Sequence, residues 1–138
     1  MAFNINTKSV PDTTVLHLLD PVTREPMFAD DAQTQPVTIE VYGRASKQYA
    51  AWQTDANRKA VQRRAKYGKD KEQTLEEQRE STVDLLVAIT KSVQNLEYND
   101  ELADNPITIR AMYSDKSLYW IGDDVAALIG DTATFLQK

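Results

Sequence analysis

The stretch Asn105 to Lys138, NPITIRAMYSDKSLYWIGDDVAALIGDTATFLQK, decides how the rest of the chain must fold. It is the segment richest in apolar and aromatic residues. Asn105 before Pro106 predicts a helix start, because asparagine caps orphan N–H groups and proline loses no hydrogen bond at the first helical position. Ser114-Asp115 predicts a second cap, and Gly130 predicts a stop. So much apolar surface must be covered by upstream segments or by a partner.

The composition is that of one soluble domain. The chain has 138 residues, of which 41% are hydrophobic, enough for a single core. Its formal net charge of −5 favours solubility and argues against a general affinity for nucleic acid. It has no cysteine, hence no disulfide framework. No run approaches the ~20 apolar residues of a membrane span, and the start lacks a signal-peptide core. We expect a cytoplasmic protein that does not bind membranes.

The N-terminal third predicts an arm and a small β element. Residues 1–12 are polar and are expected to form a flexible arm. Residues 13–43 are expected to form the β element, with a first strand over Thr13–Leu19. The best strand is Val37–Tyr42, in which Val37, Ile39 and Val41 alternate with polar residues and share one face. So small an antiparallel sheet needs helices packed on it.

Residues 46–138 predict the helical part of the same domain, which spans 13–138. Ser46 is expected to start a helix with one face formed by Tyr49, Trp52, Ala56 and Ala60. Thr74 and Glu77 form a capping box that opens a glycine-free central helix, expected to extend to about Asn95. A polar loop is expected over Leu96–Asp104. The predicted fold is α+β and mainly helical, with three to four helices on the small N-terminal antiparallel β element.

The sequence contains no residue pattern typical of an enzyme active site. His17 is the one histidine, and on an apolar strand it is expected to face solvent or to have a satisfied polar neighbour. Nucleophilic and metal sites need partners that the spacing does not supply. Adjacent carboxylates occur at Asp30-Asp31, Glu76-Glu77 and Asp123-Asp124. Each pair lies in a loop or near an expected helix start, where solvation or the helix dipole explains its presence without a catalytic role. The four glycines are scattered and form no phosphate-binding loop. We expect no catalytic residue, no cofactor and no metal site.

The basic run 57–71 supports three interpretations. It holds seven of the chain's sixteen lysines and arginines, namely Arg58, Lys59, Arg63, Arg64, Lys66, Lys69 and Lys71. These cations can form a solvated helix face balanced by the acidic residues that follow. They can also form a docking face for an acidic protein partner. The third interpretation is nucleic-acid binding, since clustered cations release counterions from phosphates. The sequence alone leaves all three open.

An ordered set of motifs resembles the tail assembly chaperones of long, non-contractile-tailed bacteriophages, including the lambda-like group. The motifs are PVTIEVYG at 36–43 with Ser46 and Tyr49, Asn57-Arg58, LLVA at 85–88, Asn105-Pro106, IRAMY at 109–113, LYWI at 118–121, IGD at 129–131 and Phe135-Leu136. The resemblance covers most of the chain from about residue 13. One departure is the segment 94–98, where family members often carry a bulky loop containing tryptophan.

The resemblance implies a function in tail assembly. Such proteins are not enzymes; they bind the tape measure protein, keep it soluble, and recruit tail tube subunits around it. Many exist in a short form and a frameshifted longer form, whose extension contacts the tail tube protein. They act in the host cytoplasm and are absent from the mature virion. Self-association along a long client is a further expectation.

We therefore expect tape measure helices to bind one aromatic face with basic residues nearby. The predicted partner-binding residues are Leu86, Val93, Tyr113, Tyr119, Trp120, Leu128, Arg58, Arg63 and Arg64. The alternative function is a small nucleic-acid-binding regulator that uses the basic helix 57–71. A third interpretation is a structural subunit of the tail, which would be found in purified virions.

Overall fold

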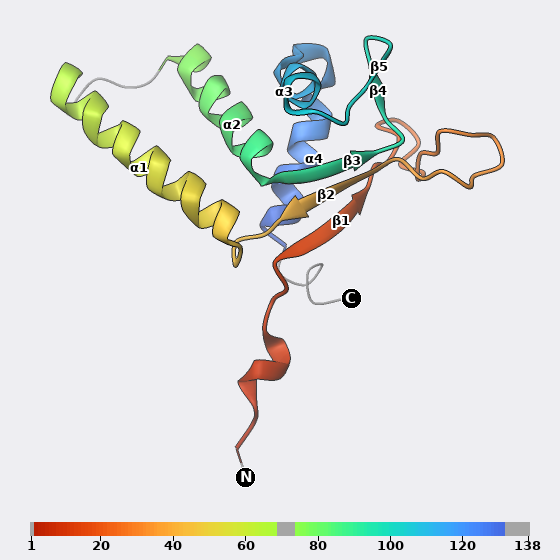
Figure 1. Cartoon of the computed structure of the whole chain (residues 1–138), viewed down its shortest axis with the longest axis horizontal. Helices are drawn as coiled ribbons and strands as arrows, with labels where there is room; N and C mark the ends of the chain where they lie inside the picture. The colour runs from red at the N-terminus through yellow and green to blue at the C-terminus, as the bar shows by residue number, and fades with distance from the viewer. Residues whose placement is uncertain (1, 69–73, 132–138) are drawn as a thin grey trace.

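The computed structural model describes residues 2–68 and 74–131, and it has an α+β fold (Figure 1). The strands of the main sheet are β1 (Thr13–His17), β2 (Thr38–Tyr42) and β3 (Thr90–Gln94). The helices are α1 (Lys47–Tyr67), α2 (Leu75–Ile89), α3 (Pro106–Ser114) and α4 (Tyr119–Ile129). Short 3-10 turns occur at Ile5–Lys8 and Lys116–Leu118, and a small hairpin is formed by β4 (Glu97–Tyr98) and β5 (Glu101–Leu102). Lys69 and Lys71 of the basic run and the pair Phe135-Leu136 lie outside the described residues.

The main sheet is built around β2, which pairs antiparallel with β1 on one side and with β3 on the other. Ile39 faces Leu16 of β1 and Val93 of β3, and Val41 is fully buried. The predicted alternation of Val37, Ile39 and Val41 on one face is confirmed, because all three lie in the core. This apolar face is the surface that the helices cover.

The central helix is shorter than predicted. It ends at Ile89 instead of about Asn95, and the next five residues form β3. Thr90 has an extended backbone, and its Oγ1 donates a 2.7 Å hydrogen bond to the Leu86 carbonyl, which satisfies the helix end. The segment Thr90–Gln94 then pairs with an edge of β2 that would otherwise be unpaired. Val93 has the spacing of an apolar residue on the same face of the central helix, but pairing with β2 makes its segment a strand.

The predicted loop over Leu96–Asp104 contains the β4–β5 hairpin. Its two turn residues, Asn99 and Asp100, have positive φ angles of 51° and 66°. Asparagine and aspartate tolerate this conformation and are typical of two-residue hairpin turns. The Tyr98 hydroxyl donates a 2.8 Å hydrogen bond to the Asp115 carboxylate, so the hairpin is attached to the segment between α3 and α4.

The predicted helix caps are confirmed. The side chains of Ser46, Thr74 and Asn105 each accept a hydrogen bond from a backbone N–H in the first turn of α1, α2 and α3, and Pro106 is the first residue of α3. Asp115 caps the 3-10 turn that leads into α4. The helices α2 and α4 cover the apolar face of the sheet, and α3 packs on these two helices and completes the core (Figure 1).

His17 has a satisfied polar neighbour. Its Nε2 lies 2.8 Å from the Met27 carbonyl oxygen, and its ring meets Phe28 edge-on with centroids 5.0 Å apart. The interaction fixes the loop that follows β1 against the end of that strand. This outcome matches the second of the two expectations for the residue.

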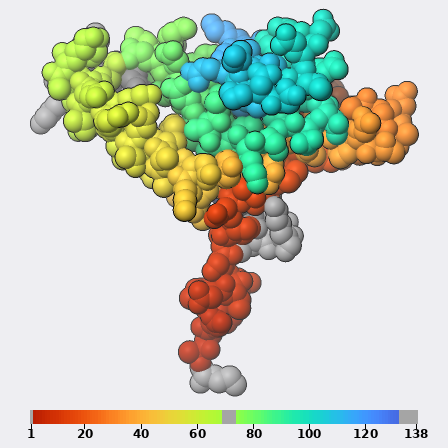
Figure 2. Space-filling model, viewed as in Figure 1, coloured from red at the N-terminus to blue at the C-terminus, as the bar shows by residue number. Residues whose placement is uncertain are grey.

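Two segments have no fully buried residue, although Tyr49 of α1 packs against the edge of the core. The 21 residues of α1 include none that is buried, and the helix stands at one end of the molecule (Figure 2). Residues 2–9 are exposed and project from the sheet, with Phe3 and Ile5 each 71% exposed. The mobility of this arm stays a prediction. No helix within residues 2–68 and 74–131 has the length and apolarity to cross a bilayer.

The two faces of the sheet should respond differently to the same truncation. Val41 is fully buried, so Val41→Ala should lower the free energy of unfolding by about 2 kcal/mol or more. Val15 is 48% exposed and points away from the helices, so Val15→Ala should cost less than about 1 kcal/mol. Urea unfolding followed by circular dichroism measures both values. Equal losses would contradict the assignment of the two faces.

Candidate functional site

A groove runs between α1 and α2. Its volume is about 480 Å³, within the range of pockets that bind ligands or partner side chains. We call it the α1–α2 groove. It is lined by Trp52, Asp55, Ala56, Lys59, Ala60 and Arg63 of α1 and by Glu77, Glu80, Ser81 and Asp84 of α2.

Chain topology and small side chains together keep the groove open. Four residues separate the end of β2 from the start of α1, and α2 ends directly before β3. Val41 and Thr90 face each other across these strands, so the start of α1 and the end of α2 lie at the same end of the sheet. They diverge from there (Figure 1). Alanine and serine at the facing positions are too short to fill the space between them.

The floor of the groove is the helix face that the sequence predicts. Trp52 lines the groove, and Tyr49 lies beside it with the two ring centroids 5.8 Å apart; both side chains are half-buried. Ala56 and Ala60 continue the same face along α1. The apolar stripe of α1 therefore divides: Tyr49 packs against the core, whereas Trp52, Ala56 and Ala60 border the cavity.

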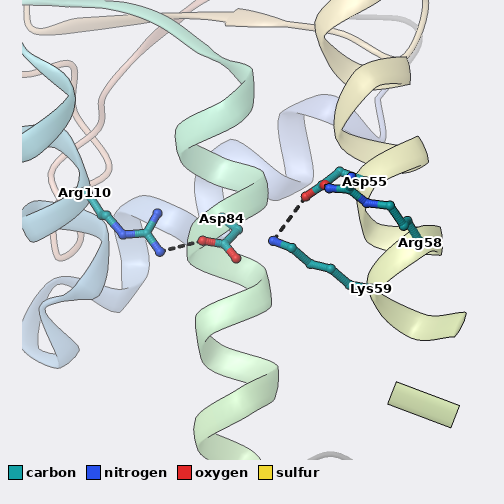
Figure 3. Close-up of polar contacts among 5 residues, drawn as sticks. All are labelled: Asp55, Arg58, Lys59, Asp84 and Arg110. Carbon is teal, nitrogen blue, oxygen red and sulfur yellow. Dashed lines mark hydrogen bonds and ion pairs between the residues drawn. The ribbon is translucent and has the colours of Figure 1, made fainter. Parts of the chain in front are cut away.

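The two walls carry opposite charge. The α2 wall presents the carboxylates of Glu77, Glu80 and Asp84. The α1 wall presents Lys59 and Arg63, which follow Asp55 along the helix. Several of these groups are already paired: Asp55 with Arg58 and Lys59, Asp84 with Arg110 of α3, and Glu77 with Arg63. Figure 3 shows Lys59 extending from α1 toward α2 while its ammonium lies 3.1 Å from Asp55.

The pair Arg63–Glu77 crosses the groove and connects the two helices far from the sheet. Partial burial acts to raise the pKa of Glu77. The hydrogen bond from the Thr74 backbone and the Arg63 guanidinium outweigh it and hold the pKa below its ordinary value. Glu77 is thus a carboxylate at neutral pH, with both the helix cap and the ion pair depending on its charge.

The nine predicted binding residues do not form one surface. Leu86, Tyr113 and Leu128 are buried in the helical layer, and Val93 is buried in β3. These four side chains belong to the core and do not present an open face.

Burial fixes the role of Tyr113 in particular. Its hydroxyl lies 2.8 Å from Thr90 Oγ1. Burial raises the pKa of Tyr113 to about 12.

The adjacent aromatics Tyr119 and Trp120 divide between surface and core. Tyr119 is 63% exposed, whereas Trp120 is half-buried and packs against the core. Tyr119 also borders a smaller pocket of about 190 Å³ between α2, α3 and α4, together with edges of Leu86 and Tyr113. Of the apolar candidates, Tyr119 is the most accessible to a partner.

The three predicted arginines all lie on α1, with different surroundings. Arg63 lines the α1–α2 groove, Arg58 pairs with Asp55 on its own helix, and Arg64 is exposed. Sequence reasoning missed Lys59, Glu80 and Asp84 as groove residues. The signal was present, because Glu77, Glu80 and Asp84 recur every three to four residues and form one polar stripe on α2.

Comparison of the chain with protein-family models, curated proteins and solved structures found no match. The likeness to tail assembly chaperones is therefore a resemblance of motifs. Function has to be argued from that resemblance together with the geometry of the α1–α2 groove.

The Arg63–Glu77 pair should control the separation of the two helices. Stability that depends on a lowered pKa is complete above the ordinary pKa of glutamate, 4.5, and is lost as the pH falls through the lowered value. Because the chain has no cysteine, spin labels at Val61→Cys and Leu75→Cys can report the distance between α1 and α2. The distance distribution should be narrow at neutral pH and should broaden in acid.

Glu77→Gln should give the broad distribution already at neutral pH. The matched control is Glu76→Gln, which removes a neighbouring exposed carboxylate outside the groove and should leave the distribution narrow. A native distribution in Glu77→Gln would show that the pair does not hold the helices.

Proposed function

We propose that this protein is a phage tail assembly chaperone that binds helices of the tape measure protein in the α1–α2 groove. One observation supports the groove as the binding site more than any other. A helix of 21 residues contributes no buried residue, yet it borders a cavity of about 480 Å³ whose floor includes a tryptophan and two alanines. Helices in proteins gain most of their stability from packing an apolar face. A partner helix would supply that packing for α1.

The dimensions suit a helix as the guest. Packed helices lie about 8–10 Å apart, and small residues at the contact allow the closest approach. Ala56, Ala60 and Ser81 are such residues, and Trp52 offers one large apolar contact. Partners that insert an amphipathic helix into a groove are a common mode of recognition. The same mode would shield the apolar stripe of a long, aggregation-prone helical client.

Reversible binding fits the charge of the site. The walls of the groove are solvated ion pairs, and exposed pairs contribute little affinity individually. The net charge of −5 helps keep a complex with a long client in solution. The proposal includes the recruitment of tail tube subunits through a frameshifted longer form, in the host cytoplasm and outside the mature virion. Self-association along the client stays a prediction.

The nucleic-acid-binding alternative receives less support from the same residues. Lys59 and Arg63 of the basic run line a groove whose other wall carries Glu77, Glu80 and Asp84. These carboxylates would repel a phosphate backbone that approached the two cations. A binding assay across salt concentrations distinguishes the two functions, because contacts with several phosphates give a steep loss of affinity with salt.

Blocking the groove should abolish the chaperone activity. Ala60→Trp places an indole in the cavity, whereas Ala65→Trp places the same group on an exposed part of α1 that does not line it. When each variant is co-expressed with the tape measure protein, Ala60→Trp should lower the soluble, co-purified client by about tenfold or more, equivalent to ~1.4 kcal/mol. Ala65→Trp should behave like the native protein.

Circular dichroism should show that both variants are folded, since both positions are exposed. Equal recovery of the client with the two variants would reject the groove as its binding site. Unchanged client solubility with and without the native chain would reject the function itself.

A further inference from the structure

We propose that the α1–α2 groove selects helices with an acidic flank and a basic flank on either side of an apolar stripe, and that this charge pattern fixes the direction in which the helix lies. The inference rests on the proposed function, because it specifies the chemistry of the client segment that the groove accepts. It follows from the difference in charge between the two walls.

The α2 wall is acidic along its length. Glu77, Glu80 and Asp84 all line the groove, and their spacing places them on one stripe about 10 Å long at 1.5 Å per residue. Glu80 has no ion pair among the described residues. Asp84 pairs with Arg110, which belongs to α3 on the far side of α2 (Figure 3). This wall is therefore complementary to a row of lysines or arginines.

The α1 wall is basic beyond Asp55. Residues 57–67 contain no acidic side chain, and Lys59 and Arg63 of this segment line the groove. Arg58, Arg64 and Lys66 stand beside them on the same helix. This wall is complementary to a row of glutamates or aspartates.

Attraction between α1 and α2 within the chain accounts for only part of this arrangement. Of the four ion pairs at the site, Arg63–Glu77 crosses the groove, while the other three stay on α1 or connect α2 with α3. Lys59 is paired with Asp55 of its own helix, and Glu80 on the opposite wall has no ion pair within the described part of the chain. Two walls of opposite sign thus remain apart with an apolar floor between them.

The guest must carry the inverse pattern. A helix whose apolar stripe rests on Trp52, Ala56 and Ala60 turns one flank to α2 and the other to α1. Two basic flanks would meet repulsion at α1, and two acidic flanks would meet it at α2. Reversing the direction of a helix exchanges its left and right flanks. A bipolar helix therefore fits in one direction, and the mirror arrangement of its flanks fits in the opposite direction.

Four synthetic helical peptides with one shared apolar stripe test the inference. Two carry one acidic and one basic flank in mirror arrangements, the third has two acidic flanks and the fourth has two basic flanks. Fluorescence anisotropy at low salt should show both bipolar peptides binding about tenfold more tightly than either uniform peptide. The preference should weaken as salt screens the charges.

Direction is measured by energy transfer between a dye at the peptide N-terminus and a dye on Val61→Cys, near the outer part of α1. One bipolar peptide should give high transfer and its mirror should give low transfer. Lys59→Glu should reduce the preference for bipolar peptides, whereas Lys47→Glu, which is exposed on the same helix outside the groove, should not.

Equal binding of all four peptides, binding of none, or equal energy transfer for the two mirror peptides overturns the inference. The proposed function is decided separately by the comparison of Ala60→Trp with Ala65→Trp on the tape measure protein. If the four peptides bind equally but Ala60→Trp still reduces recovery of the tape measure protein, the groove binds helices without selecting the charge of their flanks.

Discussion

The pairing of β2 with β3 is the constraint on which the rest of the structure depends. It fixes the end of α2 to the centre of the sheet, and it places the apolar residues of β2 beneath α2 and α4. Because β2 also leads directly into α1, the same pairing brings the start of α1 next to the end of α2. Two helices that share an origin and diverge must leave a groove unless large side chains fill it. Alanine and serine at the facing positions leave it open.

This arrangement divides the helices by role. α2, α3 and α4 bury their apolar faces and hold the domain together, whereas α1 is attached at its beginning and by the Arg63–Glu77 pair. Since α1 has no fully buried residue, it is held more weakly than the other three helices. A weakly held helix beside an apolar-floored groove is the element best placed to adapt to a partner.

Much of the fold follows from local patterns in the sequence. The caps at Ser46, Thr74 and Asn105 and the alternation of β2 are properties of a few adjacent residues. The position of β3 is not, because Thr90–Gln94 becomes a strand only through pairing with residues about fifty positions earlier. Val93 was predicted to bind a partner from the central helix, but it is buried in β3 and belongs to the core.

The candidate site was harder to predict for the same reason. Tyr113 and Leu128 have the composition of a binding face, and only their packing identifies them as core. Glu80 and Lys59 look like ordinary solvated charges, and only the divergence of α1 from α2 makes them walls of one groove. Residue type alone does not distinguish an apolar stripe that is covered from one that borders a cavity.

Hydrogen exchange on the complex with a helical segment of the tape measure protein tests the central claim most directly. The account predicts slower exchange of backbone amides over residues 52–63 of α1 and 77–84 of α2, with no change in the strands β1, β2 and β3. Protection confined to the region around Tyr119, or a complex that leaves α1 unprotected, would contradict the claim that the groove is the binding site.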